Sequence, residues 1–468
     1  LYNHGFRGQI FATEATTQLC NIMLKDSAHI QMFEAEWRNR KAARSGGKLK
    51  EFVPLYDMDA AVNVCKQFVG CEYDKIYNIA DGIKIRFTDV GHLLGSASIE
   101  VWATEKTENG DVTEKIVFSG DIGNINKPII KDPKHVTDAD YVVMESTYGN
   151  RSHGGTPNYV EDLTNIFKRT FERGGNVVIP SFAVGRTQEL LYIIRKIKED
   201  NLVGRDFDVY MDSPLAIEAT NIFIKNVESC FDDEAVELVR KGINPLSFPG
   251  LKYATTGDES KQINFDPNPK VIISSSGMCE AGRIRHHLKH NLWRPECTIV
   301  FVGYQAVGTT GRIIVDGAEE IKLFGEPIQI KAEIVQLKGS SGHADKDGLL
   351  CWINAFDRKP KKVFVVHGED SVCDEFTECL KEEYGYDAMA PYTGGSYDLI
   401  ADRVISEGVK ERKTRRTTST QRGKTVFDRL VAAGKRLMTV ITHNEGGTNK
   451  DLAKFTDQIN ALCDKWDR

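Results

Sequence analysis

The pattern of hydrophobic and polar positions changes twice along this chain. Residues 83–103 and 115–119 alternate between apolar and polar side chains, which is typical of antiparallel strands with one buried face. From about residue 158 to about 325, short apolar runs alternate with helical patterns, and this indicates a parallel, Rossmann-like sheet. Residues 327–400 then return to short strands. We therefore expect an α/β fold in which one α/β unit is inserted within another domain. The apolar runs of that unit cover residues 176–180, 208–211, 270–273 and 298–302.

Both ends of the chain carry further patterns. A short strand over 9–12 and a helix from Thr16 to about Leu24 are expected, followed by a basic, Gly-containing stretch over 35–50 that is either a solvated linker or face, or an RNA-facing loop. Between Lys410 and Lys424 there are seven basic residues and one acid. An amphipathic helix follows, whose apolar stripe either packs on its own domain or forms the seam of a homodimer. The stripe consists of Leu452, Phe455, Ile459, Leu462 and Trp466.

Composition narrows the class of protein. The 468 residues carry a net charge of −6, so a nucleic-acid partner would have to meet a local basic surface. Ten Cys without a Cys-x-x-Cys pair favour free thiols in a reducing cytosol, and hence a cytoplasmic protein. No apolar run reaches about 18 residues, so no membrane partner is expected.

Three candidate metal ligands lie where predicted strands end. His92 follows a strand in a Gly-rich turn, Asp121 lies in Ser-Gly-Asp-Ile-Gly, and His367 directly follows the apolar run 363–366. Each alone has an ordinary structural explanation, as a turn residue or a buried histidine. Together, neutral imidazole and carboxylate groups suit zinc, and one carboxylate can bridge two cations. Two such metals would activate a water and stabilise the leaving oxygen of a phosphodiester.

Glu145 and His343 are candidates for the proton transfer that metals do not supply. A histidine is the usual general acid near neutral pH, and a nearby carboxylate keeps it oriented and protonated. The alternatives are a helix or turn cap for Glu145 and a helix N-terminal residue for His343.

These segments resemble the motifs of a known family. Gly-His92-Leu-Leu-Gly-Ser, Ser-Gly-Asp121, Glu145-Ser-Thr-Tyr-Gly, Ser-Gly-His343-Ala-Asp and Val-His367-Gly-Glu occur in the order found in the β-CASP branch of metallo-β-lactamase-fold ribonucleases. The resemblance runs from Leu1 to about residue 400. It implies a metallo-β-lactamase αββα sandwich with an inserted β-CASP domain, two Zn²⁺, and a single-stranded RNA substrate. It also implies that His92, Asp121 and His367 hold metal, with Asp121 bridging, and that Glu145 and His343 serve the acid role.

The expected domains follow from the pattern and the resemblance together. Residues 1–150 and 330–400 should form the two parts of the metallo-β-lactamase domain, and residues 155–325 the β-CASP domain. Residues 401–468 should form a basic linker and C-terminal helices.

One feature of the family is absent from the printed sequence. No His-x-His-x-Asp-His motif occurs in it, and Leu1–Phe6 resembles the segment that closely follows that motif, so His4 is not a ligand candidate. We expect an N-terminally truncated chain that holds little or no zinc and is inactive, and a parent protein that is active.

Two loops are candidate phosphate contacts. Ser181–Thr187 and Ser274–Arg283 each follow a strand and open a helix, where backbone N–H groups can bind phosphate, although ordinary turn chemistry explains them equally. The resemblance favours RNA contacts from Arg186, Ser276 and Arg283. The second loop superficially resembles a P-loop, but Arg283 and Ile284 replace its Lys and Ser/Thr, which argues against nucleotide hydrolysis. His286, His287 and His290 follow it, and we interpret them as a polar face near the substrate path.

Three functions compete. A zinc-dependent ribonuclease is the leading interpretation. Another hydrolase of the same fold, acting on small substrates, would not need an inserted domain that holds a long strand. A non-catalytic RNA-binding or scaffold subunit would carry degenerate metal motifs. The five motifs that occur in the printed sequence are all intact.

Overall fold

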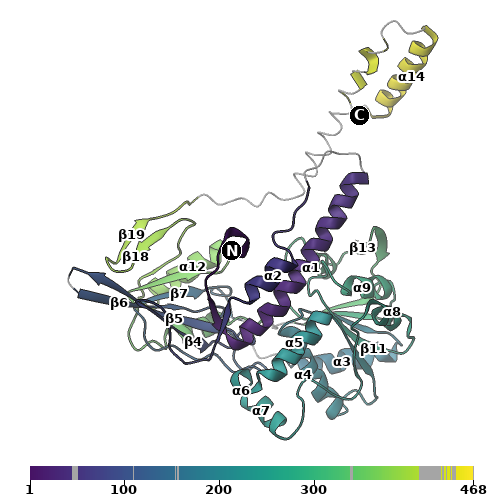
Figure 1. Cartoon of the computed structure of the whole chain (residues 1–468). Helices are drawn as coiled ribbons and strands as arrows, with labels where there is room; N and C mark the ends of the chain where they lie inside the picture. Colours follow the sequence, from purple (N-terminus) through teal and green to yellow (C-terminus); the bar gives the residue numbers. More distant parts are fainter. Residues whose placement is uncertain are drawn as a thin grey trace. The chain divides into compact units, whose positions relative to one another are not determined.

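The computed structural model describes residues 1–44, 51–108, 110–152, 154, 158–337, 341–410, 434, 437–438, 440–442, 444 and 449–466. The chain divides into two compact units, Leu1–Gly408 and Val409–Arg468 (Figure 1). In the second unit, helix α14 spans Asn449–Trp466, and Leu462 of its apolar stripe is 55% exposed. The basic stretch noted in the sequence lies outside the described residues beyond Lys410.

The described part of the first unit contains a seven-stranded mixed sheet. Its order is β17-β16-β7-β6-β5-β4-β3; β3 to β6 pair antiparallel, and β6, β7, β16 and β17 run parallel. The alternation seen in the sequence is confirmed, because β4, β5 and β6 form the antiparallel part. The strands are β3 (Tyr77–Ala80), β4 (Ile83–Asp89), β5 (Ala97–Thr107), β6 (Gly110–Phe118), β7 (Tyr141–Glu145), β16 (Lys362–Val366) and β17 (Ala388–Met389).

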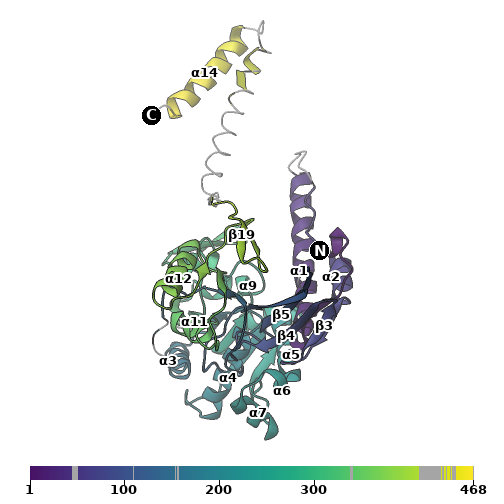
Figure 2. The same cartoon turned by 90° about the vertical axis from the view of Figure 1, so that its left-hand side faces the viewer.

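Layers cover both faces of this sheet (Figure 2). On one face, α11 (Lys346–Ile353) and α12 (Asp370–Glu382) pack through a core that includes the fully buried Trp352 and Phe376. On the other face lies the parallel pair β1 (Ile10–Thr13) and β2 (Phe68–Cys71), followed by α1 (Glu14–Arg44) and α2 (Met58–Cys65). The order of layers is helix, sheet, sheet, helix, as an αββα sandwich requires.

A buried ionic group ties three strands of this sheet together. Glu100 of β5 is fully buried and accepts two hydrogen bonds from Arg86 of β4 and one from Thr88, each of 2.7 Å. It also forms an ion pair with Lys115 of β6 at 2.7 Å. Burial alone would raise the pKa of Glu100, but these hydrogen bonds hold the pKa below its usual range.

The second large sheet is wholly parallel and has the order β10-β9-β11-β8-β12-β15. Four of its strands coincide with the predicted apolar runs, and β15 comes from beyond residue 325, where the pattern was expected to stop. Burial on both faces explains why these strands read as continuous apolar runs. The strands are β8 (Val177–Pro180), β9 (Asp208–Asp212), β10 (Leu251–Tyr253), β11 (Lys270–Ser274), β12 (Thr298–Phe301) and β15 (Glu333–Gln336).

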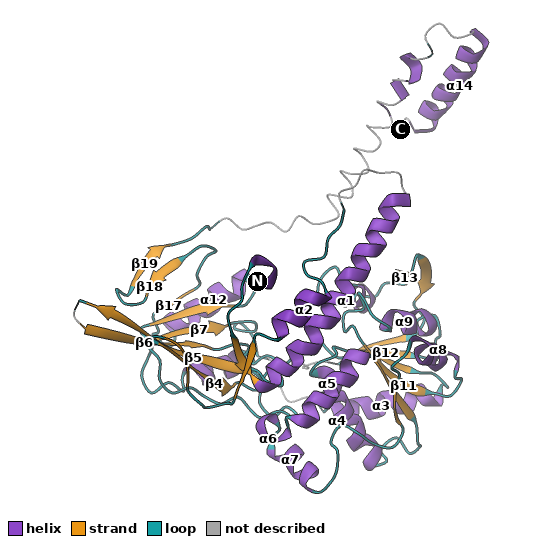
Figure 3. Ribbon diagram, in the orientation of Figure 1, coloured by secondary structure: helices purple, strands orange, loops and turns teal. Residues whose placement is uncertain are grey.

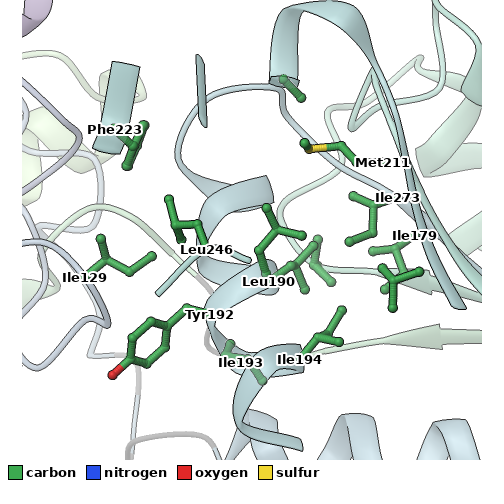
Figure 4. Packing of buried hydrophobic residues seen from close by; sticks show 14 of the residues in the cluster. Ile129, Ile179, Leu190, Tyr192, Ile193, Ile194, Met211, Phe223, Leu246 and Ile273 are labelled. Atoms are coloured by element: carbon green, nitrogen blue, oxygen red, sulfur yellow. The ribbon is translucent and has the colours of Figure 1, made fainter. Parts of the chain in front are cut away.

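Helices enclose the parallel sheet (Figure 3). Figure 4 shows one of its cores, where Leu190 and Ile194 of α4 meet Ile179 of β8, Met211 of β9 and Ile273 of β11. The helices are α3 (Tyr159–Glu172), α4 (Arg186–Glu199), α5 (Pro214–Lys225), α6 (Val227–Cys230), α7 (Asp233–Arg240), α8 (Gly257–Phe265), α9 (Ile284–Asn291) and α10 (Thr310–Val315). Two antiparallel hairpins, β13 (Glu320–Leu323) with β14 (Glu326–Gln329) and β18 (Ser396–Asp398) with β19 (Arg403–Ser406), and a short 3₁₀ helix over Tyr2–His4 complete the unit's described elements.

The prediction for the N-terminal helix was wrong in length. Helix α1 continues to Arg44, so residues 35–44 are neither linker nor loop, and their mostly exposed side chains agree with the alternative of a solvated face. Residues 45–50 of that stretch lie outside the described residues. Ala, Glu, Lys and Arg dominate its second half, and ion pairs one turn apart, Arg38 with Glu34 and Arg40 with Glu36, support it on the exposed side.

Candidate active site

Three neighbouring parallel strands deliver candidate residues to one edge of the seven-stranded sheet. β7 ends at Glu145, which pairs in register with Val366, the last residue of β16, so His367 leaves the sheet beside Glu145. β6 ends at Phe118, three residues before Asp121. Because the carboxyl ends of parallel strands gather at the same edge, these side chains meet there.

Close backbone approach shapes the loops at this edge. Gly91 and Gly120 adopt positive φ angles of 64° and 62°, a conformation that suits glycine. A Cβ on Gly123 would lie 2.0 Å from the carbonyl oxygen of Gly91 and 2.6 Å from the backbone nitrogen of His92. The loop that carries His92 and the loop that carries Asp121 are therefore in direct backbone contact.

Glu145 and His343 form a hydrogen-bonded pair in which the carboxylate is buried and the imidazole is partly exposed. Nδ1 of His343 lies 3.0 and 3.1 Å from the two carboxylate oxygens of Glu145, which is only 1% exposed. The backbone N–H groups of Ile122 and Thr147 also donate to this carboxylate. Burial opposes the charge on both groups, but their mutual hydrogen bond lowers the pKa of Glu145 and raises the pKa of His343. The pair therefore favours a carboxylate beside an imidazolium.

Asp121 lies between two histidines. Its Oδ2 atom is 3.9 Å from Nε2 of His92, and its Oδ1 atom is 3.3 Å from Nε2 of His367. Each oxygen therefore faces a different imidazole, which is the disposition that a bridging carboxylate needs.

The donor set fits a metal ion. Burial, followed by the neighbouring His343 and Lys127, lowers the pKa of His92 to about 4, so its imidazole is neutral as a ligand must be. Nδ1 of His92 is buried and has no hydrogen-bond partner in the described part of the chain. Ligand atoms of His92, Asp121 and His343 all lie within 4.8 Å of one another. Geometry thus admits His343 as a ligand too, although Glu145 already engages its Nδ1.

A cleft of about 2210 Å³ opens at this site. His92, Lys127 and His343 line it on the side of the seven-stranded sheet, while α1 and loops of the parallel-sheet domain line the rest. Lys127 donates to the carbonyl oxygen of His92 at 2.9 Å and pairs with Glu189 at 3.2 Å. Sequence reasoning missed Lys127, because it lies in an irregular loop without a motif.

The three predicted RNA contacts all line this cleft but differ in their surroundings. Arg186 pairs with Glu189 at 2.6 Å, and the hydroxyl of Ser276 lies 3.3 Å from the carbonyl oxygen of Ala281. Arg283 instead donates to Asp212 at 2.7 Å and to the carbonyl oxygens of Ala254 and Thr255 at 3.0 and 2.8 Å. Its guanidinium therefore holds the loop in place.

Asp212, which sequence reasoning also missed, is the centre of a buried network. It is fully buried at the end of β9 and binds Nε2 of His287 at 2.6 Å and the hydroxyl of Ser260 at 2.5 Å. Burial would raise the pKa of Asp212, but these hydrogen bonds and that from Arg283 keep it below the ordinary value. The interpretation of three histidines as one polar face was wrong for His287, which is fully buried.

Comparisons with known proteins agree with this geometry. A family model described as Beta-Casp domain matches residues 187–314, and one described as Zn-dependent metallo-hydrolase RNA specificity domain matches residues 327–391. The chain is 33% identical over 370 residues to Ribonuclease TTHA0252 of Thermus thermophilus, covering 79% of this chain and 77% of that protein. The chain belongs to the β-CASP branch of metallo-β-lactamase-fold ribonucleases. The expected fold and the expected class of metal-dependent hydrolase are thereby confirmed.

Other relatives of this β-CASP protein differ in name and length. It is 30% identical over 399 residues to transcription termination factor FttA of Methanosarcina mazei. That match covers 83% of this chain but 59% of the FttA protein. It is 34% identical over 295 residues to an RNase J-like protein of Methanocaldococcus jannaschii, covering 62% of this chain and 65% of that protein. None of the helices in the described ranges is long and apolar enough to cross a membrane.

Proposed function

We propose that this β-CASP protein hydrolyses phosphodiester bonds of single-stranded RNA with two zinc ions, in RNA processing or decay. The observation that carries the proposal is the position of Asp121, with one oxygen toward His92 and the other toward His367, beside the hydrogen-bonded Glu145–His343 pair.

The metal ligands in this proposal are His92, Asp121 and His367. Zinc bound there would supply an activated water and stabilise charge on the phosphate oxygens. The donor types, neutral imidazole and carboxylate, are those that zinc takes.

The acid in this proposal is His343. Glu145 accepts from Nδ1, which fixes the ring and keeps it protonated, so Nε2 carries the proton that is given to the leaving oxygen. Glu145 acts through His343 and is a positioning residue. The loops that carry Arg186 and Ser276 face the same cleft and are the proposed contacts to RNA phosphate.

The ligand count sets an expectation for the 468-residue chain itself. A binuclear zinc site takes about four donors per metal, whereas the proposed ligands here are three residues. We therefore propose that this chain alone holds zinc weakly and does not cleave RNA. A form that also carries the His-x-His-x-Asp-His motif binds zinc tightly and cleaves RNA.

The test measures zinc content by emission spectroscopy together with cleavage of a labelled RNA, for both forms. The control is Asp121→Asn in the form with the motif, which keeps the size of the side chain but weakens the bridge. Zinc-dependent cleavage that Asp121→Asn abolishes would support the proposal. Full zinc loading and cleavage by the 468-residue chain alone would contradict the ligand count.

A non-catalytic RNA-binding subunit is the alternative, and the same assay separates the two. RNA binding without cleavage in the form with the motif would favour it.

We also keep the homodimer as a proposal, because Leu462 on the apolar stripe of α14 is exposed within its own unit. Sedimentation of Leu462→Glu against the unchanged chain tests that contact.

A further inference from the structure

One face of helix α1 presents large apolar side chains to the cleft. Met23, Ile30, Phe33 and Trp37 all line it, and their spacing of seven, three and four residues places them on a single side of the helix. Phe33 is 60% exposed and Trp37 is 53% exposed. A contiguous apolar surface of this kind on a folded unit marks a site of interaction.

A third exposed aromatic ring lines the same cleft from the parallel-sheet domain. Phe324, at the tip of the β13–β14 hairpin, is 47% exposed and has a φ of 53°, in the left-handed region that bulky residues rarely adopt. Its ring stacks on His286 with centroids 4.4 Å apart and an angle of 24° between the planes. The guanidinium of Arg285 lies 4.8 Å from the Phe324 centroid. These two neighbours hold the ring in place, and almost half of the side chain remains exposed.

Charged groups accompany the rings. Lys41 lies 5.0 Å from the Trp37 ring, and Lys322 lines the cleft near Phe324. Nε of Arg285 is buried and finds no hydrogen-bond acceptor among the described residues. Arg38 is already paired with Glu34 at 3.6 Å. The other acids that line the cleft are Asp26, Glu189, Asp212 and Glu280. The lining of the cleft therefore carries Lys41, Arg285 and Lys322 as well as the three rings.

The aromatic face is connected to the candidate active site by α1 itself. Thr16, in the first turn of α1, donates to the carbonyl oxygen of Gly95, in the loop that carries His92. From Thr16 to Trp37 the helix rises by roughly 30 Å at about 1.5 Å per residue. A strand stacked at about 3.4 Å per nucleotide would need about nine nucleotides to cover that length, and an extended strand fewer.

We propose that Phe33 and Trp37 of α1 and Phe324 of the hairpin form a base-stacking subsite for single-stranded RNA, several nucleotides away from the bond that is cleaved. This inference rests on the proposed function and specifies its substrate. Bases stack on the three rings, while Lys41 and Arg285 contact the phosphates. A paired duplex cannot use the rings, because its bases are already stacked on one another, so the subsite selects unpaired RNA.

The expected effect depends on RNA length. A base–aromatic stack changes the dissociation constant by roughly 5- to 150-fold per base. Trp37→Ala should therefore weaken binding of an RNA of about 20 nucleotides by about tenfold or more. The affinity for an RNA of about four nucleotides, which occupies only the candidate active site, should stay the same. Phe33→Ala and Phe324→Ala should behave in the same way.

The experiment is fluorescence anisotropy of labelled RNAs of both lengths with the 468-residue chain at fixed salt, which requires no cleavage. Trp293→Ala is the matched control for Trp37, since Trp293 is 54% exposed and lies outside the cleft. Phe265→Ala, where the side chain is 70% exposed, is the control for both phenylalanines. Trp37→Leu keeps apolar surface without a ring and should bind as weakly as Trp37→Ala, whereas Trp37→Phe should recover part of the affinity.

Failures of the two proposals give different results. If the form with the His-x-His-x-Asp-His motif neither binds nor cleaves RNA, the proposed function fails. If that form cleaves RNA but the 468-residue chain binds neither RNA, the stacking subsite alone is refuted. If the chain prefers the long RNA but Trp37→Ala and Phe324→Ala bind it as tightly as the unchanged chain does, only the stacking subsite is refuted. Equal affinity of Trp37→Leu and the unchanged chain would also refute stacking, and would point to an apolar partner such as a protein segment.

Discussion

Replacing Arg283 by Ala should lower the stability of the first unit far more than it lowers the affinity for RNA. The resemblance to β-CASP ribonucleases predicts that Arg283 contacts RNA. In the structure, however, Arg283 donates hydrogen bonds to Asp212 and to two backbone carbonyl oxygens. Asp212 is fully buried, so Arg283→Ala leaves a buried carboxylate with only His287 and Ser260 as partners.

The magnitude follows from burial. Breaking a fully buried ion pair costs about 3–5 kcal/mol, and the Arg283 side chain is 24% exposed, so about 3 kcal/mol is expected. The first unit has 408 residues, which gives an unfolding entropy of roughly 0.9 kcal/mol per K. Tm should therefore fall by about 3–4 °C.

The assay pairs differential scanning calorimetry with the salt dependence of RNA binding. A lost phosphate contact reduces the slope of log affinity against log salt by about 0.7 for a single strand, and we expect no such change for Arg283→Ala. The matched control is Arg285→Ala, whose buried Nε finds no acceptor among the described residues and which should reduce the slope with little change in Tm. A Tm within about 1 °C of the unchanged chain, combined with a reduced slope, would refute the structural role of Arg283.

Three further predictions follow from the site and its sheet. In the form that also carries the His-x-His-x-Asp-His motif, His343→Ala should slow RNA cleavage by about 10²–10⁴-fold with zinc content unchanged; loss of zinc would show that His343 is a ligand. Gly123→Ala should weaken zinc binding, measured by titration, because its Cβ would meet the carbonyl oxygen of Gly91 at 2.0 Å, whereas Gly303→Ala, with nothing within 4 Å, should be silent. Glu100→Gln should lose about 3–5 kcal/mol of unfolding free energy at pH 7 in a denaturant titration. Because the pKa of Glu100 is lowered in the folded state, its contribution is present above the ordinary value of 4.5 and fades as pH falls below it. The difference between Glu100→Gln and the unchanged chain should therefore shrink in acid, and a constant difference would contradict the assignment.

Periodicity made the two sheets predictable, and strand ends made much of the site predictable. Alternation over 83–103 reports one buried face, and continuous apolar runs report two. His92, Asp121 and His367 could be placed because each follows a strand, and parallel strands end at a common edge.

Other features depend on contacts that no local pattern encodes. The partners of Asp212 lie 71 and 75 residues along the chain, at Arg283 and His287, without a recognisable spacing. Helix α1 was expected to end near Leu24, because the large side chains beyond that point face the cleft and do not mark a core. β15 joins the parallel sheet by pairing with β12, which the change of pattern near residue 325 did not indicate.

The insertion of one domain within another also determines the order in which parts of the first unit can fold during translation. The hydroxyl of Ser146, just beyond β7, donates to the carbonyl oxygen of Val366, 220 residues later. At about 5–20 residues per second, a ribosome needs roughly 10–45 s to make that interval. Throughout it, β7 has no β16 beside it, and its apolar edge is open to pairing with other chains. His367 emerges only after the whole parallel-sheet domain, so the candidate metal site is among the last parts of the first unit to form in a newly made chain.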